Sequence, residues 1–255
     1  MYTAGIDIGS ISTKAVILEE GKILASRVIF TGYHAESAGK KAFDAVLADL
    51  RIGRSDVARI VSTGYGRKSL ALADKSITEI MCHAAGARHI NPRIRSIIDI
   101  GGQDSKAILL DEGGRVANFA MNDKCAAGTG RFLEVMARAM EVDLDEFGRM
   151  SLLADQPAKI SSLCTVFAES EIISLIAKGE KRENIIAGIH ESICSRVLAM
   201  ANRVGIGPPV MMTGGVAKNV GVVRAFEKAI GASVEVSAYA QVNGAIGAAL
   251  LARSL

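Results

Sequence analysis

The chain has 255 residues, of which 49% are hydrophobic and 22% charged, and its mean hydropathy is +0.28. This is the composition of an ordinary globular protein, and it excludes a disordered chain. The net charge of +3 comes from 30 basic and 27 acidic residues spread along the sequence, so no nucleic-acid partner is expected. The chain lacks the roughly 18-residue apolar run of a membrane span. It also lacks a secretory signal pattern, so the cytoplasm is the expected compartment.

An internal repeat organises the first half of the chain. A shift of 92 residues aligns residues 6–25 with residues 98–117 without a gap, and ten of the twenty positions are identical. Each copy is typical of a strand ending in Asp-Ile-Gly, a polar turn, a second strand, a glycine turn and a third strand. The second strands are expected at Lys14 to Leu18 and at Lys106 to Leu110. The repeat predicts a duplicated β-β-β-α unit, with two lobes and a cleft between them.

The remaining elements follow from hydrophobic spacing and from glycine turns. The first copy is followed by a predicted helix at Ser37 to Leu50 and a strand at Ala58 to Ser62. Helices are expected between about residues 131 and 204. An apolar strand from Val210 runs into a Gly-Gly turn and then a helix, and residues 243–255 form a predicted helix of small residues.

The two repeated turns have the residue types of a phosphate site. Asp7 and Asp99 each end a strand just before a glycine, where exposed backbone N–H groups bind phosphate oxygens and the carboxylate holds Mg²⁺. Lys14 and Lys106, seven residues later, either reach the same ligand or are ordinary exposed strand lysines. A single turn of this kind is common in hairpins that bind nothing. Two in register, with a third glycine turn, favour phosphate binding.

The four cysteines divide into two pairs. Cys82 and Cys194 lie within apolar helical patterns, as buried thiols do. Cys125 and Cys164 each precede a helical pattern, so we expect both to cap helix N-termini, where the helix dipole favours a thiolate suited to a metal or iron–sulfur cluster. A cubane needs four thiolates, which a symmetric dimer would supply. The alternative is a pair of reactive or merely capping cysteines.

Three segments resemble the phosphate and adenosine loops of the superclass of acetate kinases, sugar kinases, heat-shock chaperones and actin. They are Asp7-Ile-Gly-Ser10, Asp99-Ile-Gly-Gly-Gln-Asp104 and Thr213-Gly-Gly-Val-Ala217. The resemblance implies an α/β fold of duplicated ribonuclease-H-like domains, as in actin-like ATPases, with ATP and Mg²⁺ in the cleft. The expected lobes are residues 1–94, completed by a C-terminal helix at 240–255, and residues 95–239.

Four further segments carry a second likeness: Asn122 to Phe132, Thr165 to Glu171, Ala187 to His190 and Ala201 to Gly205. They resemble the activator component of 2-hydroxyacyl-CoA dehydratases, in the wider group that includes benzoyl-CoA reductase subunits, and the likeness covers nearly the whole chain. It implies one oxygen-sensitive [4Fe-4S] cluster per homodimer, held by Cys125 and Cys164. Ile11 departs from the family pattern, because it stands where a small residue or Thr is usual and supplies no hydroxyl.

The resemblance also implies a mechanism and a set of roles. Reduced ferredoxin or flavodoxin would load the cluster, and ATP hydrolysis would drive one electron to a client. The client would be a 2-hydroxyacyl-CoA dehydratase, a related acyl-CoA reductase or a double-cubane protein. Asp7 and Asp99 would hold Mg²⁺ and position water, with Asp99 and Gln103 as the leading hydrolytic candidates. The nucleotide ATP or ADP would be bound by Ser10, Ser12, Thr13, Lys14, Gly101, Gly102, Gln103, Asp104, Gly214, Gly215 and Gln241.

Two other functions fit the same fold. A small-molecule kinase, such as an N-acetylhexosamine kinase, would transfer phosphate to a sugar, and its cysteines would only pack. It would need a further lobe that this short chain scarcely accommodates. A nucleotide sensor would bind ATP without turnover and without a redox response.

Overall fold

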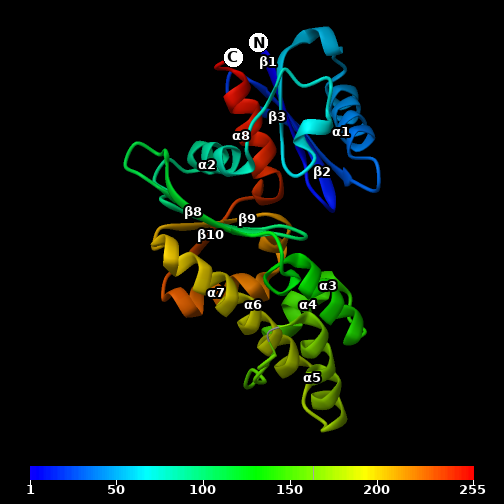
Figure 1. Cartoon of the computed structure of the whole chain (residues 1–255), viewed down its shortest axis with the longest axis vertical. Helices are drawn as coiled ribbons and strands as arrows, with labels where there is room; N and C mark the ends of the chain where they lie inside the picture. Colours follow the sequence, from blue (N-terminus) through cyan, green and yellow to red (C-terminus); the bar gives the residue numbers. More distant parts are fainter. Residues whose placement is uncertain (163) are drawn as a thin grey trace. The chain divides into compact units, whose positions relative to one another are not determined.

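The computed structural model describes residues 1–162 and 164–255, and the chain divides into two compact units (Figure 1). The first unit consists of residues 1–97, 110–117 and 237–255. The second consists of residues 98–109 and 118–236. Among the described residues, no helix is both long and apolar enough to cross a membrane.

The first unit is built on a five-stranded sheet with the order β3-β2-β1-β4-β5. Strands β1, β2 and β3 pair antiparallel, whereas β4 pairs parallel to β1 and to β5. Glu20 and Gly21 join β2 to β3 with positive φ angles of 50° and 90°, the backbone that a two-residue hairpin turn requires. The strands are β1 (Tyr2–Ile8), β2 (Ser12–Glu19), β3 (Lys22–Phe30), β4 (Val57–Thr63) and β5 (Lys75–Ser76).

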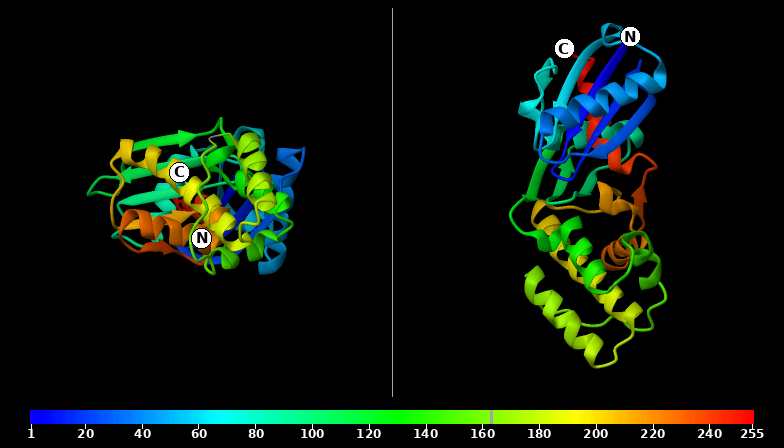
Figure 2. Two further views of the ribbon diagram at one scale, coloured as in Figure 1. Left: turned by 90° about the horizontal axis from the view of Figure 1, so that it is seen from below. Right: turned by 90° about the vertical axis from the view of Figure 1, so that its right-hand side faces the viewer.

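Helices cover both faces of this sheet, and the alternation of side chains along β2 shows why. Ala15 and Ile17 pack in the core formed with α1 (Ala35–Leu50), while Val16 and Leu18 pack against α8 (Asn243–Ala252). Figure 2 shows α1 lying across one face of the strands. The predicted strands and the helix α1 are therefore confirmed, with α1 beginning two residues earlier than expected.

The small residues of α8 are explained by its close approach to its neighbours. A Cβ atom on Gly5 of β1 would lie 1.9 Å from the Ala245 carbonyl oxygen, and one on Gly247 would lie 1.7 Å from the Cys82 carbonyl oxygen. Cys82 belongs to α2 (Glu79–Ile90), which lies beside α8 (Figure 1). Larger side chains at these two glycines would push the helix away from both neighbours.

The second sheet repeats the topology of the first. Its order is β10-β9-β6-β7-β8, so the first three strands of each copy are neighbours and the fourth strand lies beside the first. The duplicated unit expected from the repeat is confirmed. The strands are β6 (Ser96–Ile100), β7 (Ser105–Leu110), β8 (Val116–Asn122), β9 (Val210–Thr213) and β10 (Val234–Val236).

The second unit carries the helical region expected after residue 131. The long helix α6 (Arg182–Val204) contributes thirteen buried residues and packs against α4 and α7. One of them, His190, lies edge-to-face on Phe147. Burial lowers the pKa of His190 to about 3, so its imidazole is a neutral side chain of the core. The other helices are α3 (Gly130–Ala139), α4 (Leu144–Ser151), α5 (Thr165–Ala177) and α7 (Val220–Ile230).

Candidate functional site: two glycine turns and two exposed cysteines

The first glycine turn, in the first unit, places a carboxylate beside a lysine. Asp7 of β1 lies directly opposite Lys14 of β2 in the antiparallel register, and the Lys14 Nζ is 3.2 Å from the Asp7 Oδ2. The turn itself is closed by a hydrogen bond of 3.1 Å from the Gly9 N–H to the Ser12 carbonyl oxygen. Ser10 and Ser12 are half-buried at this turn. A carboxylate and an ammonium group are thus gathered at one strand end, beside a tight turn.

Threonine side chains support this turn from inside. The Thr31 hydroxyl donates to the Gly9 carbonyl oxygen at 2.8 Å and lies 2.9 Å from the Thr13 hydroxyl. Thr13, one of the residues predicted to bind phosphate, has no exposed surface. Its hydroxyl therefore fixes the shape of the turn in this structure.

The second glycine turn, in the second unit, has the same backbone and a different charge arrangement. The Gly101 N–H donates to the Asp104 carbonyl oxygen at 2.9 Å, the bond of the first turn shifted by 92 residues. The Lys106 Nζ is 3.2 Å from Asp99 and 2.7 Å from Asp104. Lys106 is only 1% exposed, so the alternative of an exposed strand lysine is wrong for this residue. Gln103 projects at the exposed tip of the turn.

The alignment of the two repeats in the sequence missed one feature, which is a matching glycine after the fourth strand of each unit. Gly64 and Gly214 have φ angles of +85° and +87°. A Cβ on Gly64 would lie 2.4 Å from the Asp7 Oδ1, and one on Gly214 would lie 3.0 Å from the Asp99 Oδ1. Each follows a threonine, and the Thr213 hydroxyl donates to the Asp99 Oδ1 at 2.8 Å. The shared Thr-Gly dipeptide was the available signal, although it is too short to stand out without the fold.

The second turn is tied to the start of α3. The Gly130 N–H donates to the Gly101 carbonyl oxygen at 2.9 Å, and the Arg131 N–H donates to the Gly102 carbonyl oxygen at 2.8 Å. These donors belong to the first turn of a helix, which has no intrahelical partners for them. A displacement of the glycine turn would therefore act directly on α3.

Cys125 is exposed and lies between β8 and α3. It caps a single 3-10 turn at Ala126–Gly128, and α3 begins only at Gly130 with Thr129 as its cap. The prediction that Cys125 caps a full helix is corrected here, because a short turn intervenes and carries less of a dipole. The Asn122 side chain holds the cysteine by accepting from its N–H at 3.1 Å and donating to its carbonyl oxygen at 2.8 Å.

Cys164 is exposed and caps α5, as the sequence predicts. The segment just before it is held by Glu171 from the second turn of that helix. The carboxylate accepts from the Ser161 N–H and the Ser162 N–H, each at 2.9 Å, and from the Ser161 hydroxyl at 2.8 Å. Burial opposes its ionisation, but these hydrogen bonds outweigh burial and lower the pKa of Glu171 to about 2.

One guanidinium lies beside both cysteine segments. Arg196 of α6 donates from its Nη2 to the Ser162 carbonyl oxygen, and its Cζ lies 5.5 Å from the centroid of the Phe132 ring in α3. Burial lowers the pKa of Arg196, while negative charge on Cys125 and on Cys164 raises it. Residues near both cysteines therefore contact the same cation.

The other two cysteines are core residues, as predicted. Cys82 in α2 and Cys194 in α6 are buried, and burial raises the pKa of each thiol to about 12. Within residues 1–162 and 164–255, no three His, Cys, Asp or Glu side chains converge on a possible metal position. Cys125 and Cys164 give one chain two accessible thiols, half of the ligand set of a cubane.

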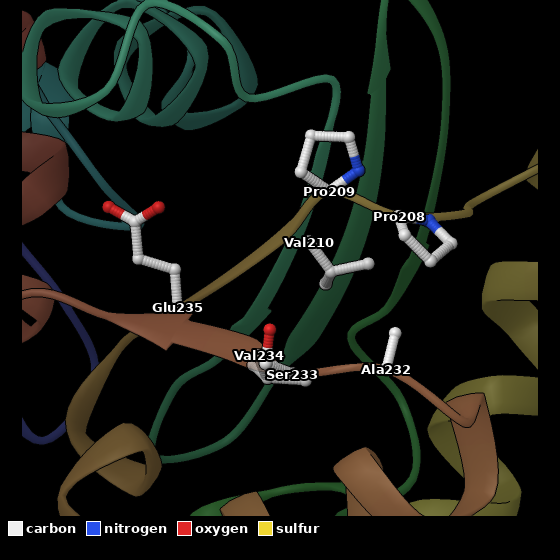
Figure 3. A pocket seen from close by; sticks show the side chains of 7 residues that line it. All are labelled: Pro208, Pro209, Val210, Ala232, Ser233, Val234 and Glu235. Atoms are coloured by element: carbon white, nitrogen blue, oxygen red, sulfur yellow. The ribbon is translucent and has the colours of Figure 1, made fainter.

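A depression elsewhere in the second unit is lined by none of the cysteines and by no residue of the two glycine turns. It lies beside β9 and β10, and Glu235 is its one charged side chain (Figure 3). Gln241, predicted to bind the nucleotide, is half-buried in the 3-10 turn that precedes α8 in the first unit.

Comparison with known proteins agrees with these features. The sequence pattern described as the BadF/BadG/BcrA/BcrD ATPase family matches residues 4–252. The activator of lactoyl-CoA dehydratase from Anaerotignum propionicum is 52% identical over 99% of this chain and 97% of its own length.

Two solved structures share both sequence and fold. One is the (R)-2-hydroxyglutaryl-CoA dehydratase component A from Acidaminococcus fermentans, with 48% identity and a TM-score of 0.96 over 100% of this chain and 98% of that one. The other is the activator of the 2-hydroxyisocaproyl-CoA dehydratase from Clostridium difficile with bound ADPNP. It has 47% identity and a TM-score of 0.94 over 100% of this chain and 95% of that one.

The actin-like fold class extends to more distant proteins. A ROK family glucokinase from Streptomyces griseus, in complex with glucose and AMPPNP, has a TM-score of 0.62 at 16% identity and covers 100% of each chain. At that identity the likeness concerns the fold alone.

Proposed function

Because the chain belongs to the BadF/BadG/BcrA/BcrD ATPase family, we propose that it is an ATP-driven reductive activator. It would pass single electrons from a [4Fe-4S] cluster to an iron–sulfur client enzyme. The observation that carries the proposal is the pair of exposed thiols, Cys125 and Cys164, in a unit that also holds a glycine turn and in which one guanidinium contacts residues near both cysteines. A sugar kinase of the same fold has no use for this arrangement.

The nucleotide part of the proposal rests on the donor groups of the two turns. Carboxylates and backbone N–H groups suit Mg²⁺ and phosphate oxygens. We assign Asp7 and Asp99 to Mg²⁺ and to positioning water, and Gln103 with Asp104 to the γ-phosphate. Lys14 is the lysine with some side-chain exposure, 14% against 2% for Lys106, and is better placed to meet a phosphate. The remaining proposed phosphate and nucleotide contacts are Ser10, Ser12, Gly101, Gly102, Gly214, Gly215 and Gln241. Thr13, which is fully buried against Thr31, would support the first turn from inside without touching the nucleotide.

The cluster part rests on the donor set of the cysteines. Exposed thiols at the start of helical turns suit iron, and one chain supplies two of the four that a cubane takes. We assign the other two to the same cysteines of a second copy, so that the active species is a homodimer. A [4Fe-4S] cluster would supply storage of one electron at low potential.

The two parts are connected by the hydrogen bonds between the second glycine turn and α3. The carbonyl groups of Gly101 and Gly102 hold the N–H groups that begin α3, and Cys125 lies five residues before that helix. A change in the turn on nucleotide binding or hydrolysis would reach the Cys125 segment through these bonds. This is the route by which we propose that ATP alters the cluster environment.

The experiment is anaerobic purification and reconstitution, followed by analysis of iron and sulfide. About four iron atoms per dimer are expected, as for one cubane. Cys125→Ser and Cys164→Ser should lose the iron, while the matched core variants Cys82→Ser and Cys194→Ser should keep it. Iron-free wild-type protein after reconstitution would contradict the proposal, and phosphoryl transfer to a sugar would then favour the kinase.

The partners are inferred from the printed functions of the relatives, three of which activate 2-hydroxyacyl-CoA dehydratases. We propose as client an iron–sulfur dehydratase of this kind, a related acyl-CoA reductase or a double-cubane protein, with ferredoxin or flavodoxin as electron donor. Anaerobic capture of a purified dehydratase in the presence of ADP and aluminium fluoride tests the first choice. Equal capture without nucleotide would count against an ATP-gated partner.

A further inference from the structure

Arg196 lies in the middle of α6 and contacts the surroundings of both exposed cysteines. Its Nη2 donates to the carbonyl oxygen of Ser162, two residues before Cys164. Its guanidinium lies 5.5 Å from the ring centroid of Phe132, near the start of the helix that follows Cys125. The side chain therefore has one contact near Cys164 and one contact in the helix that follows Cys125.

Val197, the next residue of α6, packs against the 3-10 turn that Cys125 caps. A Cβ on Gly128, in the 3-10 turn capped by Cys125, would lie 3.7 Å from the Val197 Cγ2, which is ordinary packing distance. The Cys125 turn thus packs directly on α6 beside Arg196. The guanidinium itself is held by its contacts with Ser162 and Phe132.

The positive charge of this side chain is held beside the segments that flank both cysteines, by the contacts with Ser162 and Phe132. Burial lowers the pKa of Arg196, and negative charge on Cys125 and Cys164 opposes that shift. A positive charge fixed at this place favours negative charge on a group bound nearby.

We propose that Arg196 is a positioning residue for the cluster of the proposed function. Arg196 holds the backbone at Ser162, near Cys164, and its positive charge raises the reduction potential of a cluster bound by Cys125 and Cys164. Reduction adds one negative charge, and a nearby cation stabilises the reduced form more than the oxidised form. Hydrogen bonds and charges outside the ligand shell are established means of tuning such potentials. The inference rests on the proposed function, because it requires the cluster.

Three variants separate charge from shape. Arg196→Gln removes the charge and leaves a shorter polar side chain with an amide donor. Arg196→Lys keeps the charge but loses the planar group that contacts Ser162 and Phe132 together. Arg203→Gln is the matched control, since it removes the same charge from an exposed position two helical turns further along α6.

The experiment is an anaerobic redox titration of the reconstituted proteins, followed by electron paramagnetic resonance of the reduced cluster. In Arg196→Gln we expect the reduction equilibrium to fall by about tenfold, a shift of about 59 mV to lower potential. Arg196→Lys should shift less, and Arg203→Gln should keep the wild-type potential. Iron content and circular dichroism of each protein are measured first.

The outcomes are distinct. An unchanged or raised potential in iron-loaded Arg196→Gln overturns the inference. If both Arg196 variants are folded but lose iron while Arg203→Gln keeps it, the positioning role is supported. Wild-type protein that holds no cluster after reconstitution overturns the proposed function instead, before any variant is compared.

Discussion

The two glycine turns share a backbone but differ in charge. In the first turn Lys14 meets one carboxylate, Asp7, and both side chains keep some exposure, at 14% and 9%. In the second turn Lys106 meets two, because Asp104 stands where the first copy has Ser12, and the Lys106 and Asp99 side chains are only 2% and 3% exposed. The second copy therefore has a lysine shared by two carboxylates where the first has a partly exposed ion pair, and the presence of Asp104 in place of Ser12 supplies the second carboxylate.

The largest expected effect comes from breaking that network. Lys106→Met leaves the carboxylates of Asp99 and Asp104 without their buried cation, which should cost about 3–5 kcal/mol of unfolding free energy. Lys14→Met should cost less, roughly 1–2 kcal/mol, because water already reaches that pair. Urea unfolding of the nucleotide-free proteins measures both. Equal losses would show that the two turns hold their lysines alike.

The next effect concerns hydrolysis. Asp99→Asn should lower ATP turnover by about 100-fold and Asp7→Asn by about tenfold, because only the second turn combines its carboxylate with Gln103 and Asp104. Gln103→Ala should also lower turnover. A steady-state ATPase assay measures the three variants, with the surface variant Asp111→Asn as control. Wild-type turnover in Asp99→Asn and Gln103→Ala would rule out the assignment of the hydrolytic residues.

The smallest expected effect is a change in the pH dependence of stability. It concerns the side chains that hold the two exposed cysteines, one of which is neutral and the other charged. Asn122 holds Cys125 through a neutral amide, whereas Glu171 holds the segment before Cys164 through a carboxylate. The folded-state pKa of Glu171 is lowered to about 2, below the ordinary value of about 4.3. Its contribution to stability is therefore present above pH 4.3 and is lost as the pH falls toward 2.

The matched variants for this test are Glu171→Gln and Asn122→Asp. Unfolding free energy is measured against pH for both and for the wild type. The stability advantage of the wild type over Glu171→Gln should be constant near neutral pH and should shrink between about pH 4.3 and about pH 2. A difference that stays constant down to pH 2 would show that the Glu171 carboxylate does not hold this segment by its charge.

Most of the fold could be predicted from local patterns. Hydrophobic periodicity and the positions of glycine predict the duplicated strands, their ends at Asp-Ile-Gly and the C-terminal helix of small residues. Both signals come from residues that are close together in the sequence. The same reasoning divided the cysteines, because two lie in apolar helical patterns and two do not. It misplaced the cap at Cys125, since a single 3-10 turn has no periodic signal of its own, and it set the start of α1 two residues too late.

The candidate site was predictable in its residue types and not in its contacts. That Asp7 and Lys14 pair follows from their places on adjacent strands of a hairpin. That Thr213 binds Asp99 across 114 residues does not. The equivalence of Gly64 and Gly214 was hidden as well, because two residues give no statistical signal until the strands before them are seen to be equivalent.

The sequence by itself determined the duplicated α/β architecture, the two glycine turns and the two cysteines suited to iron. These depend on short-range chemistry that each segment carries with it. The tertiary structure decided which charges act on those groups. It buried Lys106 between two carboxylates and brought Glu171 back to Ser161. It also placed Arg196, 34 residues from its partner Ser162, against segments next to both exposed cysteines. Electrostatic interactions depend on distance and burial in space, and neither is recorded in the order of residues.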